Sequence, residues 1–109
     1  MTYQEIATMI SEVGIPTAYY QFPEGTGQQP PFICFYYSEN DGFFADNITY
    51  AKRERLVIEL YTANKDFTLE AALEGVLTGK DIPFARYESY IYSEKLFMQT
   101  YEMEVFING

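Results

Sequence analysis

The sequence predicts an α+β fold in which two helices cover a mainly antiparallel sheet of about four to five strands, in the order α-β-β-β-α-β-β. Two stretches place apolar residues at helical spacing, and the stretches between them are short, rich in aromatic and β-branched residues, and separated by turn signals. The chain has 109 residues and shows no linker or internal repeat, so a single domain over residues 1–109 is expected.

The first helix follows a capping box, in which Thr2 and Glu5 each satisfy a backbone N–H of the other. Gly14 and Pro16 end it. One side of this helix carries an apolar stripe of Ile6, Met9, Ile10 and Val13.

A short apolar run at residues 18–22 predicts the first strand, and the loop at 23–31 is rich in proline and glycine. Residues 32–37 are almost continuously apolar and predict a strand in the middle of the fold. A turn is expected at 39–42, where Asp-Gly supplies positive φ, and residues 43–50 are less regular.

Alternation over residues 52–61 predicts a strand with two different faces. Leu56, Ile58 and Leu60 share one face. Arg53, Arg55 and Glu59 share the other, which is expected to face water or a partner.

The second helix is capped by Asp66 or Thr68 and closes at Gly79. Its apolar stripe consists of Leu69, Ala72, Leu73, Val76 and Leu77. A hairpin follows, with strands at 84–92 and 96–107 around a turn at 93–95. The last strand alternates Phe97, Tyr101, Met103 and Val105 with Glu102 and Glu104.

The formal net charge is −9, from 16 acidic and 7 basic residues. Such a balance argues against nucleic-acid binding and against docking on an anionic membrane. Aromatic residues make up 18% of the chain, more than a small interior can hold, and surface tyrosines suit protein interfaces. The N-terminus carries no signal-peptide pattern, so synthesis in a cytoplasm is expected.

No histidine is present, which excludes Cys–His and Ser–His–Asp catalysis, so we expect no enzyme and no cofactor. Cys34 lies in an apolar run typical of an unreactive core thiol. The acidic loop at 39–47 does not have the spacing of an EF-hand calcium site, and no metal is expected. Lys52, Arg53 and Arg55 form a basic cluster that is expected to pair with nearby acids.

Several segments together resemble a known family, and they run from about residue 30 to the end. They are residues 30–33, 43–47, 59–67, an acidic helix at 70–74, and residues 82–84, 88–96 and 101–104. The chain is similar in these segments to the small tail-terminator or tail-completion (head–tail joining) proteins of long-tailed phages and prophages of Gram-positive bacteria.

The resemblance implies a virion structural protein that assembles as a ring, usually hexameric, at the neck or tail end. Its partners would be further copies of itself, the major tail protein and head-connector proteins. The loops at 23–31 and 39–50 would contact these neighbours, with Phe43 and Phe44 as anchors and Asp46, Arg53 and Arg55 in the same interface. The alternative is a small cytoplasmic protein-binding or regulatory module that uses its aromatic face.

Overall fold

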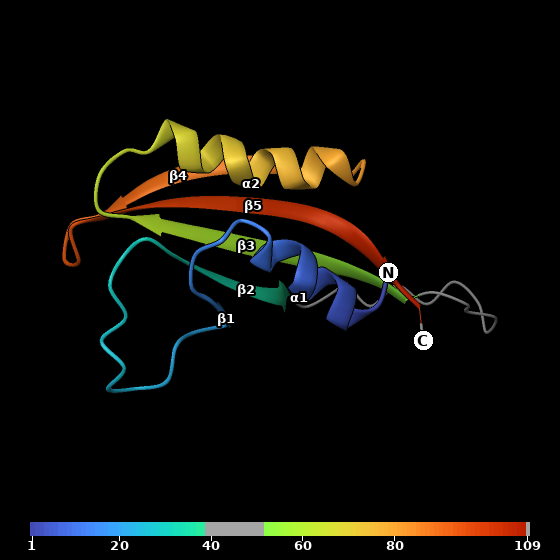
Figure 1. Cartoon of the computed structure of the whole chain (residues 1–109), viewed down its shortest axis with the longest axis horizontal. Coiled ribbons are helices and arrows are strands. Elements are labelled where there is room, and N and C mark those ends of the chain that lie inside the picture. Colours follow the sequence, from blue (N-terminus) through green and yellow to red (C-terminus); the bar gives the residue numbers. More distant parts are fainter. Residues whose placement is uncertain (39–51, 109) are drawn as a thin grey trace.

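The computed structural model describes residues 1–38 and 52–108. The chain is an α+β domain whose element order matches the predicted one (Figure 1). The elements are α1 (Tyr3–Ser11), β1 (Thr17–Tyr19), β2 (Phe32–Ser38), β3 (Lys52–Thr62), α2 (Phe67–Gly79), β4 (Ala85–Ile91) and β5 (Leu96–Ile107).

The five strands form one sheet in the order β1-β2-β3-β5-β4. β1 runs parallel to β2, and every other neighbouring pair is antiparallel, as the prediction of a mainly antiparallel sheet requires. The last strand of the chain lies inside the sheet, between β3 and β4. α2 therefore connects two strands that are separated by β5.

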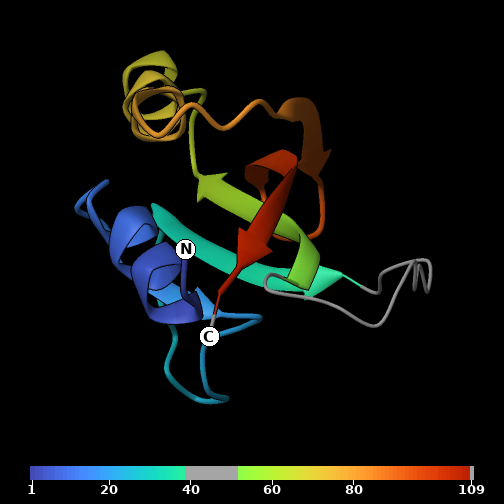
Figure 2. The same ribbon diagram turned by 90° about the vertical axis from the view of Figure 1, so that its right-hand side faces the viewer.

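Both helices lie on the same side of the curved sheet, as Figure 2 shows. We call this side the covered face and the opposite side the uncovered face. The core lies between the helices and the covered face, because alternate strand residues point toward the helices. Its fully buried members include Ile6 and Ile10 of α1, Leu73 and Leu77 of α2, and Leu56, Ile58 and Leu60 of β3.

The predicted capping box begins α1. The Thr2 hydroxyl oxygen accepts from the Glu5 backbone N–H at 3.0 Å, and the Glu5 carboxylate accepts from the Thr2 backbone N–H at 2.8 Å. Gly14 follows the helix with φ +89°, a value that glycine adopts without steric cost. The start and the end of α1 thus agree with the sequence pattern.

Asp66, and not Thr68, caps α2, because its carboxylate accepts from the Leu69 backbone N–H at 2.9 Å. The predicted apolar stripe of this helix is partly wrong: Ala72 is exposed, and Glu70 is buried with an exposed fraction of 2%. A carboxylate thus occupies a position on the packed side of α2.

The first strand is shorter than the predicted run at 18–22, since β1 ends at Tyr19. Tyr20 has φ +68°, a left-handed conformation that turns the chain out of the strand direction. The side chains of Tyr20 and Phe22 instead pack over β2, where their rings meet Tyr36 and Phe32. The prediction of a strand was therefore correct as far as Tyr19 and wrong beyond it.

Candidate functional site

The uncovered face of the sheet is the most distinctive surface of the described chain. Successive strand residues point to opposite faces, so β3 presents Arg53, Arg55, Val57, Glu59 and Tyr61 there. This placement confirms the predicted separation of the two β3 faces.

The predicted basic cluster pairs with acids, as expected. Arg55 donates to Glu102 at 2.9 Å, and Arg53 lies 3.7 Å from Glu104, both acids belonging to β5. These side chains are between about one third and just over half exposed, so the ion pairs contribute little to stability. The charges lie in a row along the β3–β5 ladder.

Three of the five predicted interface residues, Phe43, Phe44 and Asp46, lie outside the described residues. The turn expected at 39–42, the irregular segment at 43–50 and the acidic loop at 39–47 fall in the same gap. Arg53 and Arg55 are the members of the predicted interface that the structure places, and it places both on the uncovered face.

A hollow of about 730 Å³ opens on the uncovered face between the loop that follows β1 and the sheet. Its floor comes from β2 and β3, one wall from residues 20–28, and the far rim from the β4–β5 turn. Ligand sites in proteins have volumes in this range. The hollow is thus large enough to receive a side chain or a small molecule.

Aromatic rings make much of the lining of this hollow. Phe32 stacks on Tyr61 with ring centroids 4.9 Å apart, and Phe22 meets Phe32 edge-on at 5.4 Å. Tyr20 packs edge-on against Tyr36 at 5.8 Å. These contacts hold the loop at 20–28 against the sheet and fix the shape of the wall.

Glu59 supplies a carboxylate to the floor of the hollow. Its Oε1 accepts a hydrogen bond from the Tyr61 hydroxyl at 2.8 Å. Burial, and then this hydrogen bond, raise the pKa of Tyr61, so the phenol remains a donor at neutral pH. Glu94 adds a second carboxylate at the rim.

Cys34 also borders the hollow, although its exposed fraction is only 5%. Burial, assisted by the negative charge of Glu59, raises its pKa to about 11 from an ordinary 9.0. The structure confirms that the thiol is buried, but it lies on the uncovered face and outside the helix-covered core.

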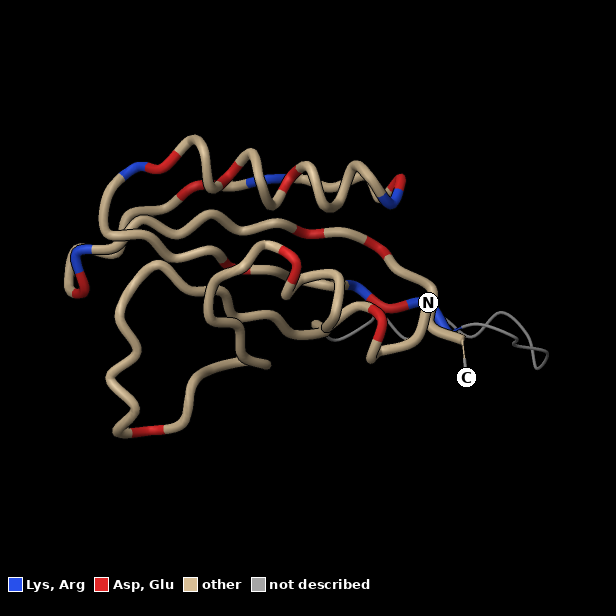
Figure 3. The backbone as a smooth tube through the Cα atoms, viewed as in Figure 1, with Lys and Arg blue, Asp and Glu red and all other residues tan. Residues whose placement is uncertain are grey.

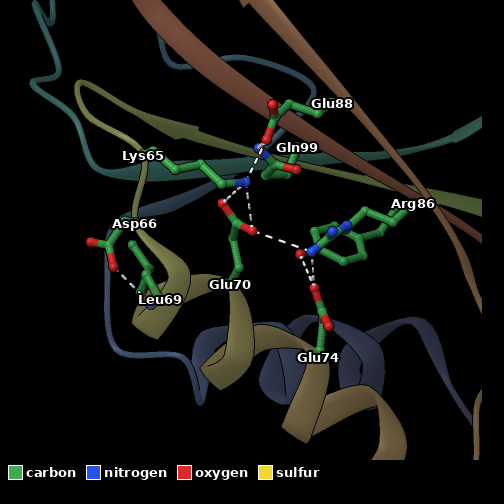
Figure 4. A network of polar contacts seen from close by, with 9 residues as sticks. Lys65, Asp66, Leu69, Glu70, Glu74, Arg86, Glu88 and Gln99 are labelled. Carbon is green, nitrogen blue, oxygen red and sulfur yellow. Dashed lines mark hydrogen bonds and ion pairs between the residues drawn. The ribbon is translucent and has the colours of Figure 1, made fainter.

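A second notable cluster is the polar layer between α2 and the strands β4 and β5 (Figure 4). Glu70 accepts from Lys65 at 3.0 Å and from Arg86 at 3.2 Å. Glu74 accepts from Arg86 and from the hydroxyl of the fully buried Tyr101, each at 2.8 Å. The buried carboxylate of α2 is therefore neutralised by two cations from neighbouring segments.

The layer continues to Glu88, which accepts from Lys65 and, at 2.7 Å, from Gln99. The hydrogen bonds from Lys65 and then Gln99 hold the pKa of Glu88 below its ordinary value. Every charged member of this layer is matched within the chain, which is typical of a structural network.

β4 forms one edge of the sheet and is exposed over nearly its whole length. Tyr87 is 55% exposed, and Tyr92, just beyond the strand, is 83% exposed. An edge strand carries backbone groups that can pair with another chain. This edge and its tyrosines form a second surface on which a protein can dock.

Within residues 1–38 and 52–108, no helix is long and apolar enough to cross a membrane. The same residues contain no group of three or more metal-ligating side chains. The chain matches no protein-family model and no curated protein.

The sequence pattern missed the hollow as a site. It placed Glu59 on the outward face of β3, but nothing in the pattern showed that the loop after β1 folds back over β2. The signal that could have indicated it is the pair of aromatic residues at Tyr20 and Phe22, whose spacing of two places both rings on one side of an extended segment.

Proposed function

We propose that the chain is a structural protein of a phage or prophage virion, a tail terminator or head–tail joining protein that acts by assembling as a ring on the tail tube. The observation that carries the proposal is the series of segments from residue 30 onward that resemble this family. Its partners are further copies in a hexameric ring, the major tail protein and head-connector proteins.

The shape of the sheet supports assembly through two different surfaces. A ring forms when one surface of a subunit contacts a different surface of the next and the rotation closes. The two ends of this sheet differ: one carries β1 and the loop at 23–31, and the other carries the exposed strand β4. A subunit with unlike ends can contact its neighbours head to tail.

The charge of the chain suits a position around a DNA channel. A net charge of −9 repels phosphates, so a genome passes without being retained. No sequence-specific nucleic acid and no membrane belong to this function. The protein is made in the host bacterial cytoplasm and is carried in the virion at the neck or tail end.

The test is deletion of the gene in the carrying phage or induced prophage, followed by electron microscopy of the lysate. We expect filled heads separate from tails, and tails of irregular length. Complementation with the intact gene on a plasmid is the control. Normal, infectious virions from the deletion strain would remove the protein from the tail.

The second candidate is a small cytoplasmic protein-binding or regulatory module. The hollow on the uncovered face favours it, since a preformed aromatic cavity suits the capture of one partner group. Normal virions from the deletion strain, together with stable binding of a host protein, would support this alternative.

A further inference from the structure

We propose that the hollow on the uncovered face binds an arginine side chain presented by a partner protein. This inference concerns one site and does not depend on ring assembly. It would apply equally to a virion neighbour and to a regulatory partner.

The first argument is electrostatic. The hollow contains the carboxylates of Glu59 and Glu94, and no Lys or Arg is found among the described residues that line it. Figure 3 shows the tube from β1 to β2 free of basic segments, with one acidic position in the loop, while the β4–β5 turn at the far rim carries one basic position beside its acidic one. The gap at 39–51 also contains no Lys or Arg, so this segment cannot supply the missing cation.

The hollow differs in this respect from the other carboxylate sites. Glu102 and Glu104 on the same face pair with Arg55 and Arg53, and Glu70 and Glu74 under α2 share Arg86. Glu59 has a tyrosine hydroxyl as its described hydrogen-bond partner and no ion pair with a described residue. Its carboxylate can therefore accept from an incoming cation.

The second argument is the aromatic lining. A cation over the face of a tyrosine or phenylalanine ring is attracted by the π electrons, and guanidinium also stacks flat on such rings. Phe32, Tyr36 and Tyr61 stand on the same face of the sheet as Glu59, in β2 and β3. A planar group beside these rings can donate to the carboxylate at the same time, which favours arginine over the compact ammonium of lysine.

The third argument concerns the source of the arginine. The wall of the hollow carries an exposed ring, that of Tyr20 at 60%, and exposed tyrosines are enriched at protein interfaces. The negative charge of the whole chain also steers a basic partner toward it. A partner protein is thus better matched than a free amine.

The test is NMR titration of the ¹⁵N-labelled full chain with N-acetyl-arginine methylamide, which carries an amide on each side as an arginine in a polypeptide does. We expect weak, saturable binding with a Kd on the order of millimolar, as for a fragment-sized ligand. The shifts should cluster on residues 20–28, β2 and β3. The isosteric but uncharged N-acetyl-citrulline methylamide should bind about tenfold less tightly or not at all.

Two variants carry the comparison. Glu59→Gln keeps an oxygen for the Tyr61 hydroxyl and should weaken binding about tenfold. Glu12→Gln makes the same change in net charge and should leave binding unchanged, because Glu12 lies at the end of α1, the helix on the opposite side of the sheet from the hollow. If Glu59→Gln fails to fold, Tyr20→Leu at the exposed wall should weaken binding about threefold through the lost ring.

Three results would overturn the proposal: equal binding of the citrulline and arginine probes, equal binding by Glu59→Gln and Glu12→Gln, or shifts that map away from the hollow. N-propylguanidine, a small guanidinium with the same single positive charge as the blocked arginine, distinguishes the source. Binding of N-propylguanidine more tightly than the blocked arginine would assign the hollow to a small cation and contradict the protein partner.

Discussion

The two faces of the sheet are made of alternate residues of the same strands, yet they are completed in different ways. On the covered face, Ile58 and Leu60 of β3 are fully buried beneath the helices. On the uncovered face, Glu59 and Tyr61 from the same strand border an open hollow. The two faces therefore differ in what covers them. The helices of the same chain bury the side chains of the covered face, whereas part of the uncovered face stays open to solvent.

Charge follows the same division. The carboxylates under α2 are matched by Lys65 and Arg86, and Tyr101 donates to Glu74 in the same layer. On the uncovered face, Arg53 and Arg55 pair across strands in partly exposed positions, while Glu59 has no described cation. We conclude that stability resides mainly on the covered face, and the partner binding that we propose would use the uncovered face.

The largest expected effect is a cavity on the covered face. Leu60→Ala should lower the free energy of unfolding by about 2–5 kcal/mol, because Leu60 is fully buried and its neighbours cannot close the space. Leu96→Ala, at a half-buried position on the uncovered face, should cost less than about 2 kcal/mol. Urea unfolding followed by circular dichroism measures both, and equal losses would contradict the comparison.

Cys34 provides a chemical probe of the uncovered face. A rise in its pKa from 9.0 to about 11 lowers the thiolate fraction at pH 8 about a hundredfold. Its reaction with a disulfide reagent should therefore be at least about a hundredfold slower in the folded chain than in urea, and should accelerate about tenfold per pH unit below the pKa. A folded rate close to that of the unfolded chain would show that the sheet beneath the hollow is open.

Two tyrosines on opposite faces form a matched pair. Tyr101→Phe removes the hydroxyl that donates to Glu74 and should cost about 1 kcal/mol of unfolding free energy. Tyr87→Phe removes an exposed hydroxyl and should change stability by less than about 0.5 kcal/mol. A larger loss of stability for Tyr87→Phe than for Tyr101→Phe would contradict the comparison, because it would assign the stabilising polar contacts to the uncovered face.

The smallest expected effect concerns the ion pair of Arg55 with Glu102. A double-mutant cycle with Arg55→Gln and Glu102→Gln should give a coupling below about 1 kcal/mol, because both side chains are partly exposed. About 1 M salt should abolish it. A coupling above about 2 kcal/mol that persists in salt would make this pair a structural element of the uncovered face.

Much of the fold followed from the sequence because its signals are local. The capping box of Thr2 and Glu5, the alternation of β3 and the hairpin of β4 and β5 each depend on nearby residues, and each is present in the structure. The exceptions required contacts distant in sequence. The parallel pairing of β1 with β2 and the insertion of β5 between β3 and β4 are set by packing, which periodicity does not report.

The candidate site was harder to predict for the same reason. A helical pattern treats Glu70 as a polar residue, and its burial becomes favourable only when Lys65 and Arg86 approach from other segments. The hollow depends on positive φ at Tyr20, an unusual conformation for a tyrosine that no local pattern indicated. The proposed anchors Phe43 and Phe44 remain a prediction.

The most direct test of the proposed function is to locate the protein in purified virions. The carrying phage or prophage is altered so that it encodes an epitope-tagged chain. Its purified particles are then labelled with gold-conjugated antibody and imaged by electron microscopy. We predict a single cluster of label at the junction of head and tail, absent from an untagged control. Infectious particles without label at that junction, with the tagged chain recovered only in the soluble lysate, would contradict a role in the virion.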